Sequence, residues 1–153
     1  MNYIPLPTDL VRALQSGAPD ANGMTPERAT SDGVGKPCRH CLRTVPEGAE
    51  MLVLAHRPFE TLHPYAESGP IFLCAEPCEQ GGGAVIPEIM TTSPGYLIKG
   101  YNKDDRIIYG SGAVVPQDQI EPYAKDVFKE HDAAYLHVRS ASNNCYLLRI
   151  DQE

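Results

Sequence analysis

The chain has 153 residues, of which 42% are apolar and 22% are charged, as expected for one globular domain with a buried core. Its formal net charge is −7 and its lysines and arginines form no cluster, so we expect neither nucleic acid nor a membrane surface as its partner. The first residues lack the pattern of a signal peptide, and no apolar run approaches the roughly 20 residues of a membrane-spanning helix. Five cysteines, an odd number, disfavour a pure disulfide framework, and we expect a cytoplasmic protein with reduced thiols.

We expect a single domain over residues 1–153. The pattern predicts a short helix over 8–15, capped by Thr8, with Leu10, Val11 and Leu14 on one face. Residues 16–36 are rich in glycine, proline and small polar residues. They are predicted to form a long loop with at most one helical turn, beginning at Thr25. The remainder, 37–153, is the core that carries the motifs.

The strand signals lie in the core segment. Short apolar or alternating runs between turn residues predict strands at 51–56, 70–75, 96–101, 106–109, 113–115, 134–140 and 145–150. We pair 96–101 with 106–109 and 134–140 with 145–150 as hairpins. A helix with an apolar face follows position 120, and its start is open between Asp118 and Glu121 as the cap. We prefer Glu121, because Pro122 then takes the first helical position. Several hairpins with one longer helix indicate an α+β fold with a mainly antiparallel sheet.

Four cysteines form two pairs, Cys38-x2-Cys41 and Cys74-x3-Cys78, separated by the 32-residue stretch 42–73. Two short pairs can deliver the four tetrahedral ligands that zinc prefers, and two antiparallel strands within 42–73 would bring the pairs together. We therefore predict that Cys38, Cys41, Cys74 and Cys78 form a structural zinc site. If one sulfur were not a ligand, His40 or His63 would be the natural substitute. The alternative is that these cysteines are small, semi-buried side chains without a metal.

Several stretches resemble a bacterial family of domains of unknown function, numbered 1203 among such families. They are Pro37-Cys38-Arg39-His40-Cys41-Leu42, Pro46-Glu47-Gly48-Ala49-Glu50, Pro64-Tyr65-Ala66-Glu67-Ser68-Gly69-Pro70-Ile71-Phe72, Arg139-Ser140-Ala141 and Asn144-Cys145-Tyr146. The resemblance covers nearly all of the chain from about Pro37 onward and the N-terminal arm more loosely. It implies no established activity.

Other chemistry stays open. Arg39, Arg139 and Asn144, together with Arg57 and Asn143, could line a pocket for a small anionic ligand, because arginine binds carboxylate and phosphate groups bidentately. Cys38 and Cys41 have the spacing of a redox dithiol, although no strand–helix pattern surrounds them. Cys145 with His137 could form a thiol–imidazole pair, but packing roles explain both residues more simply. A protein-interaction module is a further alternative, and whether the protein is an enzyme is undecided.

Overall fold

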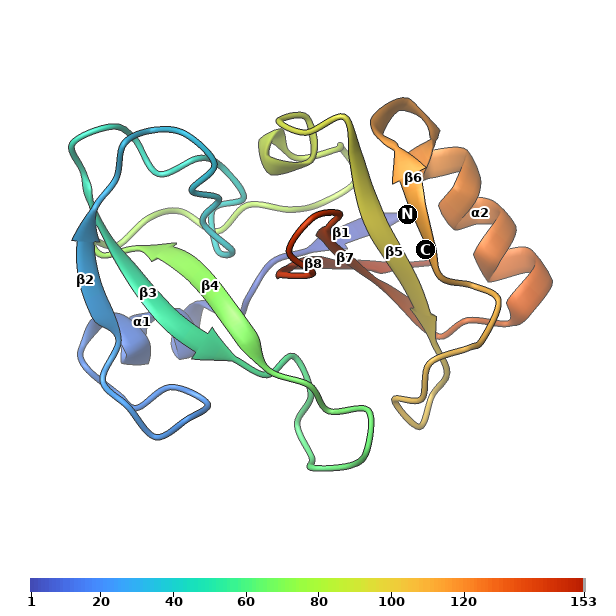
Figure 1. Ribbon diagram of the computed structural model, residues 1–153, viewed down its shortest axis with the longest axis horizontal. Helices are drawn as coiled ribbons and strands as arrows, with labels where there is room; N and C mark the ends of the chain where they lie inside the picture. Colours follow the sequence, from blue (N-terminus) through green and yellow to red (C-terminus); the bar gives the residue numbers. More distant parts are fainter. Residues whose placement is uncertain (153) are drawn as a thin grey trace.

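The chain folds into two antiparallel sheets that lie side by side, with one longer helix on the outer face of the larger sheet (Figure 1). The computed structural model describes residues 1–152. The elements in chain order are β1 (Asn2–Ile4), α1 (Thr8–Gln15), β2 (Glu27–Thr30), β3 (Glu50–His56), β4 (Gly69–Cys74), the 3-10 turn η1 (Glu88–Met90), β5 (Gly95–Tyr101), β6 (Ala113–Pro116), the 3-10 turn η2 (Gln117–Gln119), α2 (Ile120–His131), β7 (Tyr135–Ser140) and β8 (Tyr146–Asp151). The predicted α+β class with antiparallel pairing is confirmed, with the strands divided between two sheets.

The five-stranded sheet has the strand order β1-β8-β7-β5-β6. On one face, alternate strand residues such as Ile98, Leu136 and Val138 are fully buried against α2, which contributes Val127 and Phe128 to the same apolar cluster. This alternation is the period-2 pattern of a strand with one apolar face. The opposite face carries the residues in between, and it is directed toward the smaller sheet.

The three-stranded sheet has the order β2-β3-β4, and α1 packs against it. Val11 and Leu14 of α1 are buried in an apolar cluster with Leu52, Leu54 and other residues of β3 and β4. The short helix is confirmed, but its predicted cap is wrong. Helix α1 begins at Thr8 itself after Pro7, and the Thr8 hydroxyl contacts His40 instead of a backbone N–H group.

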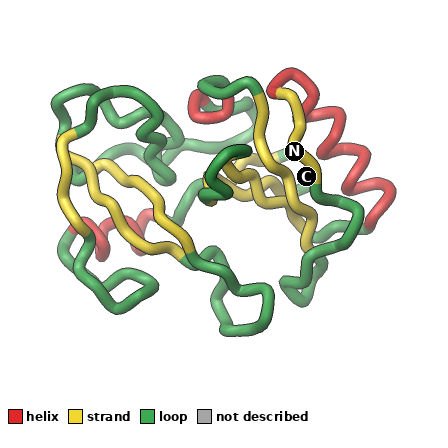
Figure 2. Tube along the Cα trace, viewed as in Figure 1, coloured by secondary structure: helices red, strands yellow, loops and turns green. Residues whose placement is uncertain are grey.

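The segment predicted as a long loop, 16–36, contains an edge strand. Residues of β2 pair with β3 in the register Glu27↔Val53 to Thr30↔Glu50, and the described residues 16–36 contain no helical turn after α1, in line with the prediction of at most one (Figure 2). The prediction failed because β2 is short and mostly exposed, so its residues lack an apolar alternation.

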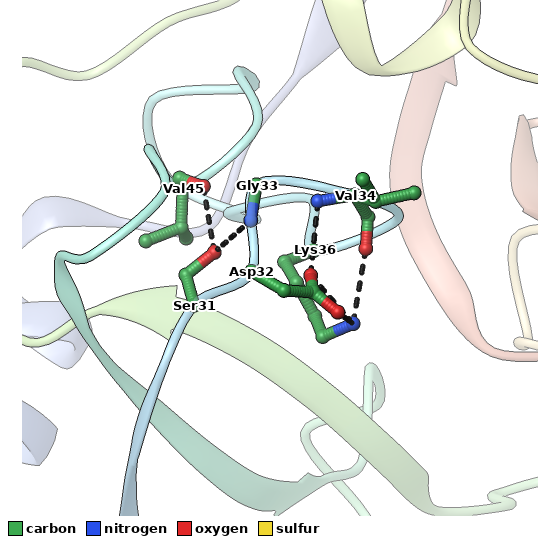
Figure 3. Close-up of polar contacts among 6 residues, drawn as sticks. All are labelled: Ser31, Asp32, Gly33, Val34, Lys36 and Val45. Carbon is green, nitrogen blue, oxygen red and sulfur yellow. Dashed lines mark hydrogen bonds and ion pairs between the residues drawn. The ribbon is translucent and has the colours of Figure 1, made fainter.

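The part of this segment after β2 is held by local hydrogen bonds, which Figure 3 shows. The buried Ser31 hydroxyl donates to the Val45 carbonyl (2.8 Å) and accepts from the Gly33 N–H (3.0 Å). The Asp32 carboxylate accepts from the Val34 N–H (3.0 Å) and pairs with the Lys36 ammonium (3.2 Å). These bonds fix the chain directly before the first cysteine pair.

Two further expectations are corrected in the last third of the chain. Strand β5 pairs with β6 and not with 106–109, where a single bridge, Tyr101↔Ile107, is followed by a turn. Helix α2 begins at Ile120 after η2, so Glu121 is not its cap and Pro122 is its third residue. This position tolerates proline because the first N–H groups of a helix have no intrahelical partner. Within residues 1–152, every helix is too short or too polar to cross a bilayer.

Candidate functional site

The first cysteine pair lies on a tight turn that precedes β3. The Cys38 N–H donates to the Arg43 carbonyl (2.9 Å), and the Leu42 N–H donates to the Cys38 carbonyl (3.0 Å). Leu42 has a φ of 56°, in the left-handed region, and this conformation reverses the chain directly after Cys41. Cys38 and Cys41 are both buried. The pair is therefore on a turn and not at the start of a helix, where a redox dithiol is usually activated.

The second pair lies at the end of β4, and α1 holds it in place. Cys74 is the last residue of the strand, and Cys78 lies in the irregular segment that follows. The Gln15 amide donates to the carbonyls of Cys74 (2.9 Å) and Glu76 (3.0 Å), and the Arg12 guanidinium donates to the Cys78 carbonyl (2.6 Å). The polar end of α1 thus orients the Cys74–Cys78 turn.

The structure brings the four sulfurs of the two pairs together. The Sγ atoms of Cys38, Cys41, Cys74 and Cys78 all lie within 4.8 Å of one another, and those of Cys38 and Cys78 are 4.0 Å apart. A tetrahedral zinc with bonds of about 2.3 Å requires sulfur separations of about 3.8 Å. The predicted strands in 42–73 are β3 and β4, and their antiparallel pairing closes this long connection. All five cysteines are free thiols, so the cluster is not a pair of disulfides.

Hydrogen-bond donors surround the sulfurs. The Cys74 N–H donates to Cys38 Sγ (3.3 Å), and His40 Nδ1 lies 3.1 Å from Cys78 Sγ. The other ring nitrogen of the fully buried His40, Nε2, lies 2.9 Å from the Thr8 hydroxyl. His40 therefore contacts the sulfur of Cys78 without being one of the four clustered candidate ligands. His63, the other suggested substitute, packs edge-on against Phe59 with ring centroids 5.2 Å apart.

The thiols influence one another's ionisation. Hydrogen bonds from Cys41 and Cys74 lower the pKa of Cys38, so this sulfur takes the first negative charge. Hydrogen bonding with Cys38 raises the pKa of Cys74, while burial and the negative charge of Cys38 raise the pKa of Cys78 to about 12. Without a cation the cluster therefore resists collecting several thiolates. A divalent metal ion reverses that preference, because it stabilises thiolate ligands.

Close backbone packing joins the two cysteine turns. The Gly81 N–H donates to the His40 carbonyl (2.9 Å). A Cβ atom at position 81 would lie 2.3 Å from the Cys41 carbonyl oxygen, which is too close for any side chain. Glycine at this position therefore lets the segment after Cys78 approach the first turn.

The three predicted ligand-binding residues occupy different surroundings. The buried Arg39 donates to the carbonyls of Tyr146 (2.7 Å) and Pro37 (2.6 Å). The buried Arg139 pairs with Glu67 (3.0 Å) and donates to the Asn144 carbonyl (3.2 Å). Asn144 is exposed in the β7–β8 turn, with a φ of 57°. Arg139 and Asn144 thus touch through the backbone of Asn144, and Arg39 contacts β8 from the first cysteine turn.

Cys145 and His137 lie in different environments. The Cys145 thiol donates to the Asn143 carbonyl within the turn (3.7 Å). The His137 ring is buried among aromatic rings, with centroids 4.6 Å from Tyr101 and 5.0 Å from Tyr146.

Sequence reasoning does not bring together the polar and aromatic residues between the two sheets, although it places Arg57 in the possible ligand pocket. These residues are His56, Arg57, Phe59, Tyr101, Tyr146 and Arg149. The available signal was the alternation of Leu136 and Val138 with His137 and Arg139, which indicates a polar sheet face. It does not indicate that the second sheet and its loops cover that face.

Comparisons with curated proteins and with solved structures find no match to the chain. A family model described as a protein of unknown function, DUF1203, matches residues 35–152. The matched segment includes both cysteine pairs and strands β3 to β8, and it agrees with the resemblance noted in the sequence. The chain belongs to the DUF1203 family.

Proposed function

We propose that Cys38, Cys41, Cys74 and Cys78 hold one structural zinc ion. The observation that supports this most directly is the convergence of four sulfurs, from two turns far apart in sequence, to within 4.8 Å. Sulfur ligands in a tetrahedral arrangement favour zinc over the hard cations calcium and magnesium. Four protein ligands complete the coordination of the ion and leave no position for substrate, so the role is structural and not catalytic.

The surroundings of the sulfurs support the same proposal. A zinc ion with four thiolates carries net negative charge, and donors to sulfur offset part of it. The Cys74 N–H already lies 3.3 Å from Cys38, and His40 Nδ1 is 3.1 Å from Cys78. A thiolate can only accept, so in the zinc-bound site His40 donates from Nδ1. In its neutral form it then accepts from the Thr8 hydroxyl at Nε2.

The metal would act as a cross-link in the smaller half of the protein. That half has a three-stranded sheet, one two-turn helix and a long irregular segment, so its apolar cluster is modest. Small cores are stabilised by cross-links such as structural metals, which add their binding free energy to the folded state. The ion would join the first cysteine turn to the end of β4, and thereby to α1.

Elemental analysis combined with a count of reactive thiols tests the proposal. Protein purified without tags or chelators should contain about one zinc per chain, with Cys145 as the single readily reactive thiol in the folded state. Cys38→Ser should lose most of the metal and lower the melting temperature by more than about 5 °C. Cys145→Ser is the matched control and should retain both. A Cys38→Ser variant with full metal content and an unchanged melting temperature would refute the proposal.

A further inference from the structure

The inner face of the five-stranded sheet is built from basic and aromatic residues. Directly paired positions share a face, and the register Lys99↔His137↔Arg149 places three such residues across β5, β7 and β8. Tyr101 and Tyr135 are paired on the same face, with stacked rings whose centroids are 5.2 Å apart. This face points away from α2 (Figure 1), and Phe59 and Ala66 of the 57–68 connection pack with Tyr101 and Tyr135 on it.

Positive charge exceeds negative charge in this region. Glu67 pairs with both Lys99 (3.4 Å) and Arg139 (3.0 Å), and Asp151 pairs with Arg149. Arg39 and Arg57 approach from the other side, close enough for their charges to act on His56 together with that of Arg139. Five cationic side chains therefore share two half-buried carboxylates, with Glu60 exposed at the rim. The local excess is opposite in sign to the charge of the whole chain, −7.

Several polar atoms in this region lack hydrogen-bond partners. Within residues 1–152 these include His137 Nδ1, His56 Nε2 and Arg57 Nε. His137 is 2% exposed. Buried polar atoms without partners are costly, and a bound ligand would satisfy them.

An open groove is lined by residues of this cluster, among them His56, Arg57 and His137. It has a volume of about 440 Å³, which is enough for a small organic molecule. Its polar wall is formed by His56, Arg57, His137 and Arg149. Its apolar wall is formed by Phe59, Tyr146 and the N-terminal residues 4–7.

We propose that this groove binds a small organic carboxylate. The carboxylate pairs with Arg149 and with Arg57, which lines the groove and forms no ion pair with the described residues. Arg149 is already oriented, because its guanidinium lies 4.1 Å from the centre of the Tyr135 ring and pairs with Asp151. The imidazoles of His56 and His137 donate to the same head group, and the apolar body of the ligand packs on Phe59 and Tyr146.

The histidines favour a singly charged head group over a phosphate dianion. Burial, together with the neighbouring arginines, lowers the pKa of His56 to about 4 and also lowers that of His137. Both rings are therefore neutral near pH 7, and they act as hydrogen-bond donors without adding charge. On the groove wall the remaining positive charge belongs to Arg57 and Arg149, and Arg149 already pairs with Asp151. One unpaired positive charge on the wall suits a singly charged carboxylate.

Calorimetric titration of the unaltered, metal-loaded chain with three matched probes tests the assignment. Benzoate carries both an apolar ring and a carboxylate, benzamide carries the ring without the charge, and acetate carries the charge without the ring. Benzoate should bind at least tenfold more tightly than either of the other two. Imidazole NMR signals of His56 and His137 should shift during the benzoate titration, while that of His131 should not.

Substitutions then locate the site. Arg57→Met should weaken benzoate binding at least fivefold, whereas Arg28→Met, the same charge change on the exposed strand β2, should alter it less than twofold. Equal affinities for benzoate and benzamide, or equal losses in the two variants, would overturn the proposal. Tighter binding of inorganic phosphate than of benzoate would overturn the assignment to a carboxylate. The probe comparison uses the unaltered chain, so it decides the matter even if Arg57→Met does not fold.

Discussion

His40 offers the sharpest test of the proposed metal centre, because its two ring nitrogens have different partners. Nδ1 lies 3.1 Å from the sulfur of Cys78, and Nε2 lies 2.9 Å from the hydroxyl of Thr8. An asparagine amide can occupy the place of Nδ1, and a glutamine amide can occupy the place of Nε2. His40→Asn should therefore keep the donor to sulfur, and His40→Gln should keep only the contact with Thr8.

The expected effect follows from the type of hydrogen bond. A bond from a neutral donor to a charged acceptor contributes about 1.5–3 kcal/mol, which corresponds to roughly 10- to 100-fold in zinc affinity. Mutating residues that hydrogen-bond to metal ligands typically weakens metal affinity by a similar factor. We expect His40→Gln to bind zinc about 10- to 100-fold more weakly than the unaltered chain, and His40→Asn to stay within about fivefold.

Competition with a chromophoric zinc chelator measures these affinities directly. Far-UV circular dichroism of each metal-free variant controls for misfolding, because a general loss of structure would weaken binding in both variants. Equal affinities in His40→Gln and the unaltered chain would refute the reasoning, because the contact of 3.1 Å between His40 Nδ1 and Cys78 Sγ would then not stabilise the Cys78 thiolate. A larger loss in His40→Asn than in His40→Gln would show that the contact with Thr8 is the important one.

Three further predictions concern stability. Gly81→Ala should lower the free energy of unfolding in urea by about 1–3 kcal/mol, because its Cβ would lie 2.3 Å from the Cys41 carbonyl oxygen. Gly69→Ala, which has open space, is the control, and an equal loss there would contradict the argument. His56 has its pKa lowered from 6.5 to about 4, chiefly by burial, so the unfolded chain binds its proton first as the pH falls. The free energy of unfolding should therefore fall by about 1.4 kcal/mol per pH unit as the pH falls from 6.5 to 4. His56→Asn should remove that contribution from the pH profile of the stability of metal-loaded protein, and parallel profiles for the two proteins would contradict the prediction. Removal of metal by a chelator should speed amide hydrogen exchange in α1, β3 and β4 more than in β7 and β8, and uniform acceleration would show that the ion stabilises the whole fold equally.

The elements that the sequence predicts well are those with a regular apolar pattern. Strands β7 and β8 and helix α1 have it, and they form where expected. Strand β2 was missed because Glu27–Thr30 is a polar edge strand, stabilised by pairing with β3 and not by an apolar face. The run 106–109 looks like a strand but forms a turn, which the side chain of Ser111 fixes by donating to the Ile108 carbonyl. The same hydroxyl accepts from the Gly100 N–H of β5 (3.0 Å), a contact between strand and turn that the local pattern does not contain.

The two candidate sites also differ in how far the sequence predicts them. Paired cysteines at short spacing imply a common centre whatever the fold, so the sulfur cluster follows from the sequence. The groove does not, because its residues come from β3, β7, β8 and the 57–68 connection without any fixed spacing. A single histidine or arginine in a strand is equally compatible with solvent exposure. Only the packing of the second sheet turns His137 and Arg139 into buried groups.

Arg39 links these two regions. It lies between Cys38 and Cys41, and its guanidinium extends to β8, where Nε donates to the carbonyl of Tyr146 (2.7 Å). The conformation of the first cysteine turn, which the proposed zinc would fix, therefore determines where Arg39 meets β8. Tyr146 in turn forms part of the apolar wall of the groove and contacts the rings of both His56 and His137. The proposed zinc would thus stabilise the junction of the two sheets, which is where the carboxylate groove lies.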